Sequence, residues 1–247
     1  MIAAADREAV VAFLTRLRRL DQNAPVRVRP MSNAASDAAP ARLWAMLPFR
    51  VLVSRRLSSA PPADITVSGA GLLDALNGGA DGSAVPRRDE AWRWPLPSSE
   101  GRVVESIPAA EVIRLAAAAA RTVRQAGAQG IGGRVVGERV LRDALLDHVA
   151  IVVTTDTGER VEIAQRMIQA LVRMALVGRL HAERHDRTDT NAHGQQPHGH
   201  ETNRSADGDS TTSGDSPVTV RLAMGWIGLS SPHGSAWYRP ISPLFLS

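Results

Sequence analysis

Aromatic and arginine side chains next to prolines are the groups in this sequence whose chemistry suggests a function. Two short segments carry them, Trp92-Arg93-Trp94-Pro95 and Trp237-Tyr238-Arg239-Pro240. Trp, Tyr and Arg supply most of the binding free energy in protein–protein contacts. We therefore select six residues as a candidate interaction site: Trp92, Arg93, Trp94, Trp237, Tyr238 and Arg239. The alternative is that each indole fills the edge of a β-core, and that alternative stays open.

Catalytic side chains do not form a recognisable arrangement. The chain has no cysteine, and it has no Gly-x-Ser-x-Gly nucleophile elbow. Asp147 and His148 are adjacent, but neighbouring residues of a helix do not face each other. We predict no catalytic residues and a non-enzymatic protein, with an enzyme lacking any recognisable motif as an alternative. A cavity joining Asp147 or His148 to other titratable groups, such as Asp156 or Glu162, would reopen the catalytic interpretation.

Glycine and histidine patterns do not predict a cofactor or a metal. Gly69-Ala70-Gly71 lies between an expected strand and helix, as in dinucleotide-binding folds, but Asp74 stands where the third glycine belongs. His193, His198 and His200 are close in sequence. They lie in a polar segment that does not preorganise ligands, and no cysteine accompanies them. We therefore expect neither cofactor nor metal.

Charge is unevenly distributed along the chain. All 29 basic residues are arginine, and the net charge is +4. The segment 181–216 contains three arginines against seven acidic residues, so the remainder is more basic. Arginine-mediated nucleic-acid binding is therefore an alternative function. We give it less weight because the helix expected at 137–148 would present Arg139 and Arg142 against three acidic residues, where phosphate contacts require positive charge.

Hydropathy argues against a membrane protein. No run of about 18 apolar residues exists. The N-terminus reaches Asp6, Arg7 and Glu8 at once, which is atypical of a signal peptide. We expect a cytoplasmic location, and we expect the partner to be another protein or a second copy of this chain.

The densest apolar segment runs from residue 137 to residue 178. Its periodicity predicts a helix to His148, a buried strand at 150–153, a turn at Asp156-Thr157-Gly158, a half-buried strand and a second helix ending at Gly178. Arg166, Gln169 and Arg173 are expected on the outer side of the second helix. This segment is interpreted as scaffold.

The remaining pattern indicates an α+β fold, with a mixed or antiparallel sheet, three to five helices and one disordered insertion. A helix is expected from Asp6 to Leu20, and an edge strand at Pro25–Arg29. Residues 1–180 plus 217–247 are predicted to form a single domain, with a possible sub-boundary near 98–106. Residues 181–216 are acidic and His-rich and are predicted to be disordered. No internal repeat is visible.

Two stretches carry a family resemblance: Leu141–Met174, and Gly234-Ser235-Ala236-Trp237-Tyr238-Arg239-Pro240. They resemble an uncharacterised protein family from actinobacteria, over the C-terminal half of the chain. The resemblance implies such a source and a cytoplasmic setting. It implies no activity and supplies no catalytic residue.

Overall fold

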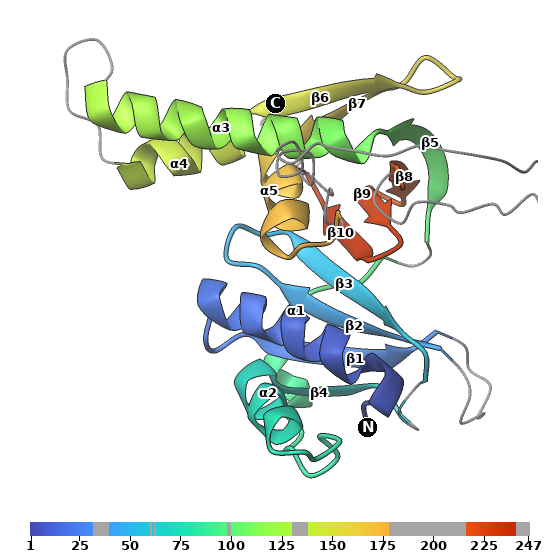
Figure 1. Ribbon diagram of the computed structural model, residues 1–247. Coiled ribbons are helices and arrows are strands. Elements are labelled where there is room, and N and C mark those ends of the chain that lie inside the picture. The colour runs from blue at the N-terminus through green and yellow to red at the C-terminus, as the bar shows by residue number, and fades with distance from the viewer. Residues whose placement is uncertain are drawn as a thin grey trace, which may run out of the picture.

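The computed structural model describes residues 1–31, 40–59, 61, 63–97, 100–129, 138–177 and 216–240. Within these residues, five α-helices accompany an eight-stranded sheet and a separate two-stranded sheet, and every strand pair is antiparallel (Figure 1). The expected α+β class with an antiparallel sheet is confirmed. Residues 181–215, which belong to the segment expected to be disordered, lie outside the described residues.

The first half of the chain supplies two helices and four strands of the large sheet. They are α1 (Arg7–Leu20), β1 (Pro25–Pro30), β2 (Ala41–Met46), β3 (Leu52–Leu57), β4 (Ile65–Ser68) and α2 (Gly69–Asn77). Asp6 precedes α1, but its carboxylate accepts hydrogen bonds from the Ser58 amide and hydroxyl instead of capping the helix. Ser68 does cap α2, accepting from the amide of Gly71.

The second half supplies three helices, the small hairpin and the other four strands of the large sheet. They are β5 (Arg102–Ile107), α3 (Ala109–Gln129), α4 (Glu138–Leu146), β6 (Val149–Thr154), β7 (Arg160–Ala164), α5 (Gln165–Arg173), β8 (Val218–Ala223), β9 (Trp226–Ser231) and β10 (Gly234–Tyr238). Strands β6 and β7 pair only with each other among the described strands.

The large sheet consists of two four-stranded halves with the same arrangement. Its strand order is β4-β1-β2-β3-β10-β9-β8-β5. Each half has three consecutive strands preceded by a helix, α1 or α5. A fourth strand, β4 or β5, pairs with the first of the three and is followed by α2 or α3. The fourth strand comes last in the first half and first in the second. The halves are therefore circular permutations of one topology, which is why no repeat is visible in sequence order.

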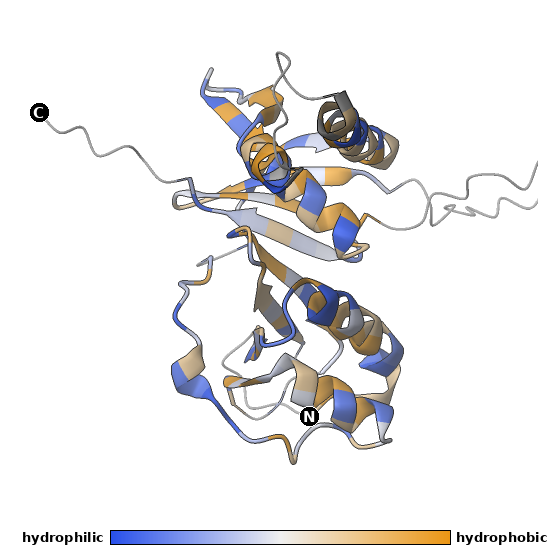
Figure 2. Ribbon diagram, turned by 90° about the vertical axis from the view of Figure 1, so that its left-hand side faces the viewer, coloured by the Kyte–Doolittle hydropathy of each residue, from blue (hydrophilic) through white to orange (hydrophobic). Residues whose placement is uncertain are grey.

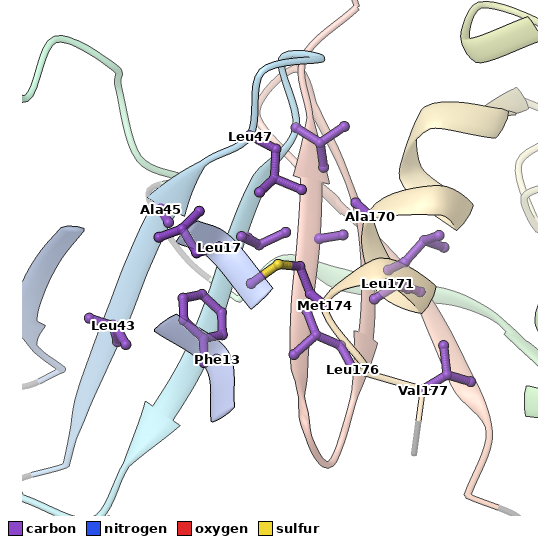
Figure 3. Close-up of a cluster of buried hydrophobic side chains, with 14 of the residues drawn as sticks. Phe13, Leu17, Leu43, Ala45, Leu47, Ala170, Leu171, Met174, Leu176 and Val177 are labelled. Atoms are coloured by element: carbon purple, nitrogen blue, oxygen red, sulfur yellow. The ribbon is translucent and has the colours of Figure 1, made fainter. Parts of the chain in front are cut away.

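The two halves share one hydrophobic core on the helical face of the sheet. Phe13 and Leu17 of α1 and Met174 after α5 are each at most 2 % exposed and belong to the same cluster. Figure 3 shows Met174 extending from the second half toward Phe13 and Leu17. The helices carry hydrophobic residues on one side and hydrophilic residues on the other (Figure 2). Packing of these amphipathic faces onto one continuous sheet joins the halves.

The opposite face of the sheet has a smaller cluster, which we call the tryptophan cluster. Its buried members are Trp44, Leu52, Trp92, Ala223, Trp226 and Trp237. They come from alternate positions of the strands, because successive side chains of a strand point to opposite faces. We call this face, which carries none of the described α-helices, the open face. Trp92 belongs to the segment that joins the two halves, so this connection crosses the open face.

Four sequence-based expectations are wrong. Residues 150–153 are not a buried strand: Val153 is buried, but Val152 is 45 % exposed because β6 belongs to a two-stranded sheet with few neighbours. Strand β1 is not an edge strand, since it lies between β4 and β2. Arg166 is buried instead of outward; it donates to the carbonyl of Phe49 at 2.8 Å and so links the halves. The second helix of the 137–178 segment ends at Arg173.

Candidate functional site

A pocket on the open face brings together residues from both candidate segments. Its volume is about 500 Å³. Trp94 and Arg239, selected from the sequence, both line it. Apolar side chains and prolines form most of the remaining wall: Met46, Leu47, Pro48, Pro95, Trp226 and Pro240. We call this the Trp94 pocket. Apolar pockets with a few polar groups are the usual form of a binding site.

Trp94 is held in position by Trp92. The two rings meet edge to face, with centroids 5.4 Å apart and an interplanar angle of 83°. The Trp92 indole N–H donates to the carbonyl of Trp94 at 2.7 Å. Arg27 lies over the Trp92 ring, and its pKa is raised, first by its hydrogen bond to Asp64. Trp92 is 9 % exposed and packs in the tryptophan cluster, whereas Trp94 is only partly buried. Packing of Trp92 thus presents Trp94 to the pocket.

The other selected residues occupy different surroundings. Trp237 is 1 % exposed, and its indole N–H donates to the Ser235 hydroxyl at 2.8 Å. Tyr238 points to the helical face, where the Arg166 guanidinium lies 4.9 Å from its ring centre. Arg93 is exposed and lies outside the Trp94 pocket. Two of the six residues therefore line one pocket, and the sequence pattern did not separate them from the rest.

Two arginines and one aspartate give this pocket its charge. Arg50, Arg239 and Asp21 line it. The Asp21 carboxylate accepts a hydrogen bond from the backbone N–H of Asn23 at 2.9 Å. Arg50 has a φ of 63°, a left-handed conformation that residues other than glycine seldom adopt. Backbone strain of this kind is most common at functional sites. The pocket has an excess of one positive charge and a strained arginine among its walls.

Three neighbouring residues were not selected from the sequence. Trp226 lines the Trp94 pocket from β9, and Arg50 lines it from the β2–β3 turn. Met224 is 86 % exposed at the β8–β9 turn, directly before Gly225 and Trp226. Met224 and Gly225 both have positive φ, as a two-residue hairpin turn requires. Of these features, only the turn could be expected from the sequence, because it contains a glycine. Arg50 and Trp226 are brought to the same pocket by the pairing of strands, which the sequence does not reveal.

A second and more polar pocket lies between the β6–β7 hairpin and the β8–β9 turn. Its volume is about 870 Å³, and its lining includes three carboxylates: Asp147, Glu159 and Glu162. It therefore joins Asp147 to Glu162, the arrangement that reopens the catalytic interpretation. Each carboxylate forms an ion pair, with Arg166, Arg102 and Arg160 respectively, and each side chain is more than half exposed. His148 and Asp156 are not among its described lining residues.

Metal-binding clusters and membrane-spanning helices are both absent from the described part of the chain. No group of three or more His, Cys, Asp or Glu side chains there is placed to hold a metal ion. No helix in that part is both long and apolar enough to span a bilayer. The histidines at 193, 198 and 200 lie outside the described residues. Gly69, from the glycine pattern, is required for packing, since a Cβ there would sit 2.8 Å from the Ala24 carbonyl oxygen.

Comparison with known families identifies the chain. Residues 96–243 match the model described as "Domain of unknown function (DUF8185)". The chain belongs to this family. Residues 1–94 of this DUF8185 protein match a second model, "Domain of unknown function (DUF8010)". The resemblance to an uncharacterised family is confirmed, and its actinobacterial source stays an expectation. The two matched segments meet beside Trp94, close to the sub-boundary expected near 98–106.

Comparisons with individual proteins add little to the DUF8185 match. No curated protein matches the chain. One matching solved structure is titled "Crystal structure of the DNA polymerase III subunit beta from Pseudomonas aeruginosa", at 12 % identity and a TM-score of 0.47. The alignment covers 97 % of this chain and 64 % of that one, so the DUF8185 protein spans less than two thirds of its length. A likeness this low carries no inference about function.

Proposed function

We propose that this protein acts by binding a protein partner at the Trp94 pocket, without catalysing a reaction. The observation that carries the proposal is the meeting of Trp94, Trp226 and Arg239 in one apolar pocket of about 500 Å³. Aromatic and arginine side chains around a pocket are the usual composition of a contact hot spot. Met224, 86 % exposed at the neighbouring turn, adds apolar contact area beside it.

The lining of the pocket suggests the chemistry of its occupant. Trp and Pro walls suit an extended segment with a proline or another apolar anchor, as in aromatic-lined grooves that bind proline-rich peptides. Arg50 and Arg239 outnumber Asp21, so an acidic residue next to the anchor complements the charge. The proposed occupant is therefore an extended segment of a partner protein that combines an apolar or proline anchor with a carboxylate.

A peptide-library selection against the full chain tests this proposal. We expect enrichment of peptides that place a proline or large apolar residue beside Asp or Glu. Arg239→Ala and Trp94→Ala should each weaken binding of an enriched peptide by about tenfold or more, as hot-spot truncations do. Arg18→Ala is the matched control, because Arg18 is an exposed arginine on α1; it should leave the affinity unchanged.

Two outcomes would contradict the proposal. One is a selection in which the wild type enriches no peptide over the Trp94→Ala variant. The other is binding that survives both pocket substitutions. Analytical ultracentrifugation of the same proteins tests whether the occupant is a second copy of the chain. A wild-type dimer that both Trp94→Ala and Arg239→Ala dissociate would identify the pocket as a dimer interface instead of a site for another protein.

A second candidate function rests on the pocket that contains Asp147, Glu159 and Glu162. Acid–base catalysis requires a carboxylate within reach of a substrate proton, and it is favoured by burial that shifts the pKa toward neutrality. Here the three carboxylates are exposed and paired with arginines. These features are typical of solvated ion pairs, so the partner-binding function is the better supported of the two.

A further inference from the structure

Three arginines lie directly opposite one another on adjacent strands of the open face. Arg29 of β1 is opposite Arg42 of β2, and Arg42 is opposite Arg56 of β3. Side chains at directly opposite positions of an antiparallel pair are close neighbours, and like charges there destabilise the sheet. This row of arginines therefore needs negative charge beside it.

The described carboxylates neutralise only part of the row. Arg29 lies 3.7 Å from Asp64, which also accepts two hydrogen bonds from Arg27. Arg42 donates to Glu100 at 2.7 Å. Arg56 is exposed and forms no ion pair with any residue that the structure describes. The positive charge at Arg56 is left without a counter-charge among these residues.

Arg42 and Arg56 line a small pocket that also contains a third arginine, Arg221 of β8. We call it the arginine pocket; its volume is about 200 Å³. Arg221 donates to the backbone carbonyls of Gly101 and Glu100, at 3.2 and 3.4 Å, and these carbonyls carry no net charge. Glu100 is the one carboxylate among the described lining residues, so three guanidinium groups face a single negative charge. The net charge of the lining is therefore +2.

Burial strengthens the effect of this excess. The Arg42 side chain is 15 % exposed. The pKa of Arg42 is lowered, first by burial and then by the charges of Arg56 and Arg221. Together these effects outweigh Glu100, which raises the pKa. Charges in such a partly desolvated site interact more strongly than they do in water. An anion that entered the pocket would relieve this repulsion.

Serine hydroxyls complete the lining. The Ser54 and Ser235 hydroxyl oxygens are 2.7 Å apart, and Ser235 also accepts from the Trp237 indole. Arg42 donates to both hydroxyls, at 3.4 and 3.5 Å. Ser235 accepts from both Arg42 and Trp237, and a hydroxyl oxygen has two acceptor positions, so Ser235 donates its own proton to Ser54 and the proton of Ser54 is left for another acceptor. Hydroxyl and guanidinium donors thus surround the pocket and outnumber Glu100, the one carboxylate acceptor among its described lining residues.

We propose that the arginine pocket binds a phosphate group, either as inorganic phosphate or as the phosphomonoester of a small molecule. A phosphate monoester carries a charge of about −1.5 to −2 at pH 7 and offers three acceptor oxygens, which match the net charge and the donors of the lining. Arginine forks bind phosphate oxygens in pairs. A volume of about 200 Å³ is enough for one phosphate group with part of its hydration.

The same face is poorly suited to nucleic acid. Binding of a single strand relies on accessible aromatic rings on which bases stack. Trp237 lines the arginine pocket and is 1 % exposed, and the rings of Trp44 and Trp92 are 6 % and 9 % exposed. Arg42 and Arg27 lie over these two rings, at 5.5 and 5.8 Å from the ring centres. The arrangement therefore offers one phosphate position without a stacking surface.

Isothermal titration calorimetry of the full chain tests the site, with inorganic phosphate and glycerol 3-phosphate as the probes. Ionic strength is kept constant with sodium chloride, so that simple screening cannot imitate binding. We expect saturable binding of at least one probe to the wild type. Arg56→Gln should weaken it about tenfold or more, as expected for loss of a charge-assisted hydrogen bond. Arg221→Gln should do the same.

Arg29→Gln is the matched control, because Arg29 belongs to the same row but lies outside the pocket and next to Asp64. It should leave the affinity within about twofold, since its guanidinium lies beside Asp64 and outside the pocket. Tighter binding of glycerol 3-phosphate than of inorganic phosphate would identify an ester as the ligand, and the reverse order would identify free phosphate. Both orders support the site.

Three results would overturn the proposal. The first is no saturable binding of either probe at millimolar concentrations. The second is equal affinity in the wild type and Arg56→Gln. The third is binding of DNA or RNA oligonucleotides that is lost in both arginine variants, while neither phosphate probe binds. The test does not depend on the partner-binding function, because the Trp94 pocket and the arginine pocket share no described lining residue.

Discussion

The indole of Trp237 lies directly against the backbone of Gly228. The two residues are opposite each other on β10 and β9, and a Cβ at position 228 would sit 2.5 Å from Cζ3 of Trp237. Glycine at this position therefore lets the ring lie on the sheet, where it lines the arginine pocket.

Gly228→Ala is expected to destabilise the protein by about 1–3 kcal/mol, the usual cost of overpacking a buried site. Trp237 would have to leave its rotamer and its hydrogen bond to Ser235. Urea denaturation measures the stability change, and tryptophan fluorescence reports the ring displacement. Gly71→Ala is the control, since its Cβ would lie 3.4 Å from Val85 in ordinary contact. Equal effects of the two substitutions would contradict this role of Gly228.

Arg50→Gly is expected to raise stability while weakening partner binding. The left-handed backbone of Arg50 costs about 1–2 kcal/mol for a non-glycine residue. Part of the gain is lost, because glycine adds about 0.5–1 kcal/mol of conformational entropy to the unfolded chain. The net gain should be about 0.5 kcal/mol by urea denaturation, and affinity for a selected peptide should fall with the loss of the guanidinium.

Ala175→Gly is the matched control for Arg50→Gly. Ala175 also has a positive φ, of 53°, and it lies outside the Trp94 pocket. It should gain stability to a similar extent and bind the peptide as the wild type does. If Arg50→Gly retained full affinity, the Arg50 guanidinium would have no role in recognition.

The pH dependence of stability should include a contribution from Asp89. Its carboxylate accepts a hydrogen bond from the Thr66 amide at 2.7 Å and pairs with Arg87. These interactions lower the pKa of Asp89 below its usual value, the Thr66 bond most strongly. Because the pKa is lowered in the folded state, the stabilisation is present above the unfolded pKa, about 3.9. It is lost as the pH falls through the folded value.

Asp89→Asn therefore removes part of the acid sensitivity. Between about pH 6 and pH 2 the wild type should lose more stability than the variant does, with the difference developing below about pH 4. Urea denaturation at a series of pH values gives both curves. Parallel curves for wild type and variant would show that Asp89 does not contribute.

Local pattern was sufficient for the elements but not for their partners. The turn at Asp156-Thr157-Gly158 and the half-buried strand after it are predicted correctly, because their causes lie within a few residues. The pairing of β3 with β10 joins segments far apart in the sequence, and nothing in either strand specifies it. Val152 looks like a core residue in sequence and is exposed, because burial depends on how many strands lie beside it.

The candidate site shows the same limit. Trp94 and Trp237 have similar neighbours in sequence, each close to an arginine and a proline. Trp94 lines the Trp94 pocket, whereas Trp237 is buried against Gly228 and lines the arginine pocket. The arginine row was not predicted either. Arg29, Arg42 and Arg56 belong to three strands, and only the register of those strands brings them together.

The two halves are expected to unfold together. Strands β3 and β10 form one continuous sheet, and Met174 of the second half packs with Phe13 and Leu17 of the first. The sheet and the core therefore both have to break for either half to unfold. We predict a single cooperative transition for the described domain, with coincident curves from tryptophan fluorescence and far-ultraviolet circular dichroism.

Met174→Ala tests which interaction joins the halves. Met174 is 2 % exposed, and its truncation leaves a cavity between α1 and the second half, so the loss should be about 2–5 kcal/mol. Met224→Ala is the matched control, because Met224 is 86 % exposed and its truncation should change stability by less than about 0.5 kcal/mol. Two separate transitions in the wild type would contradict the single domain. A Met174→Ala variant as stable as the control would show that the Met174 side chain does not help to join the halves.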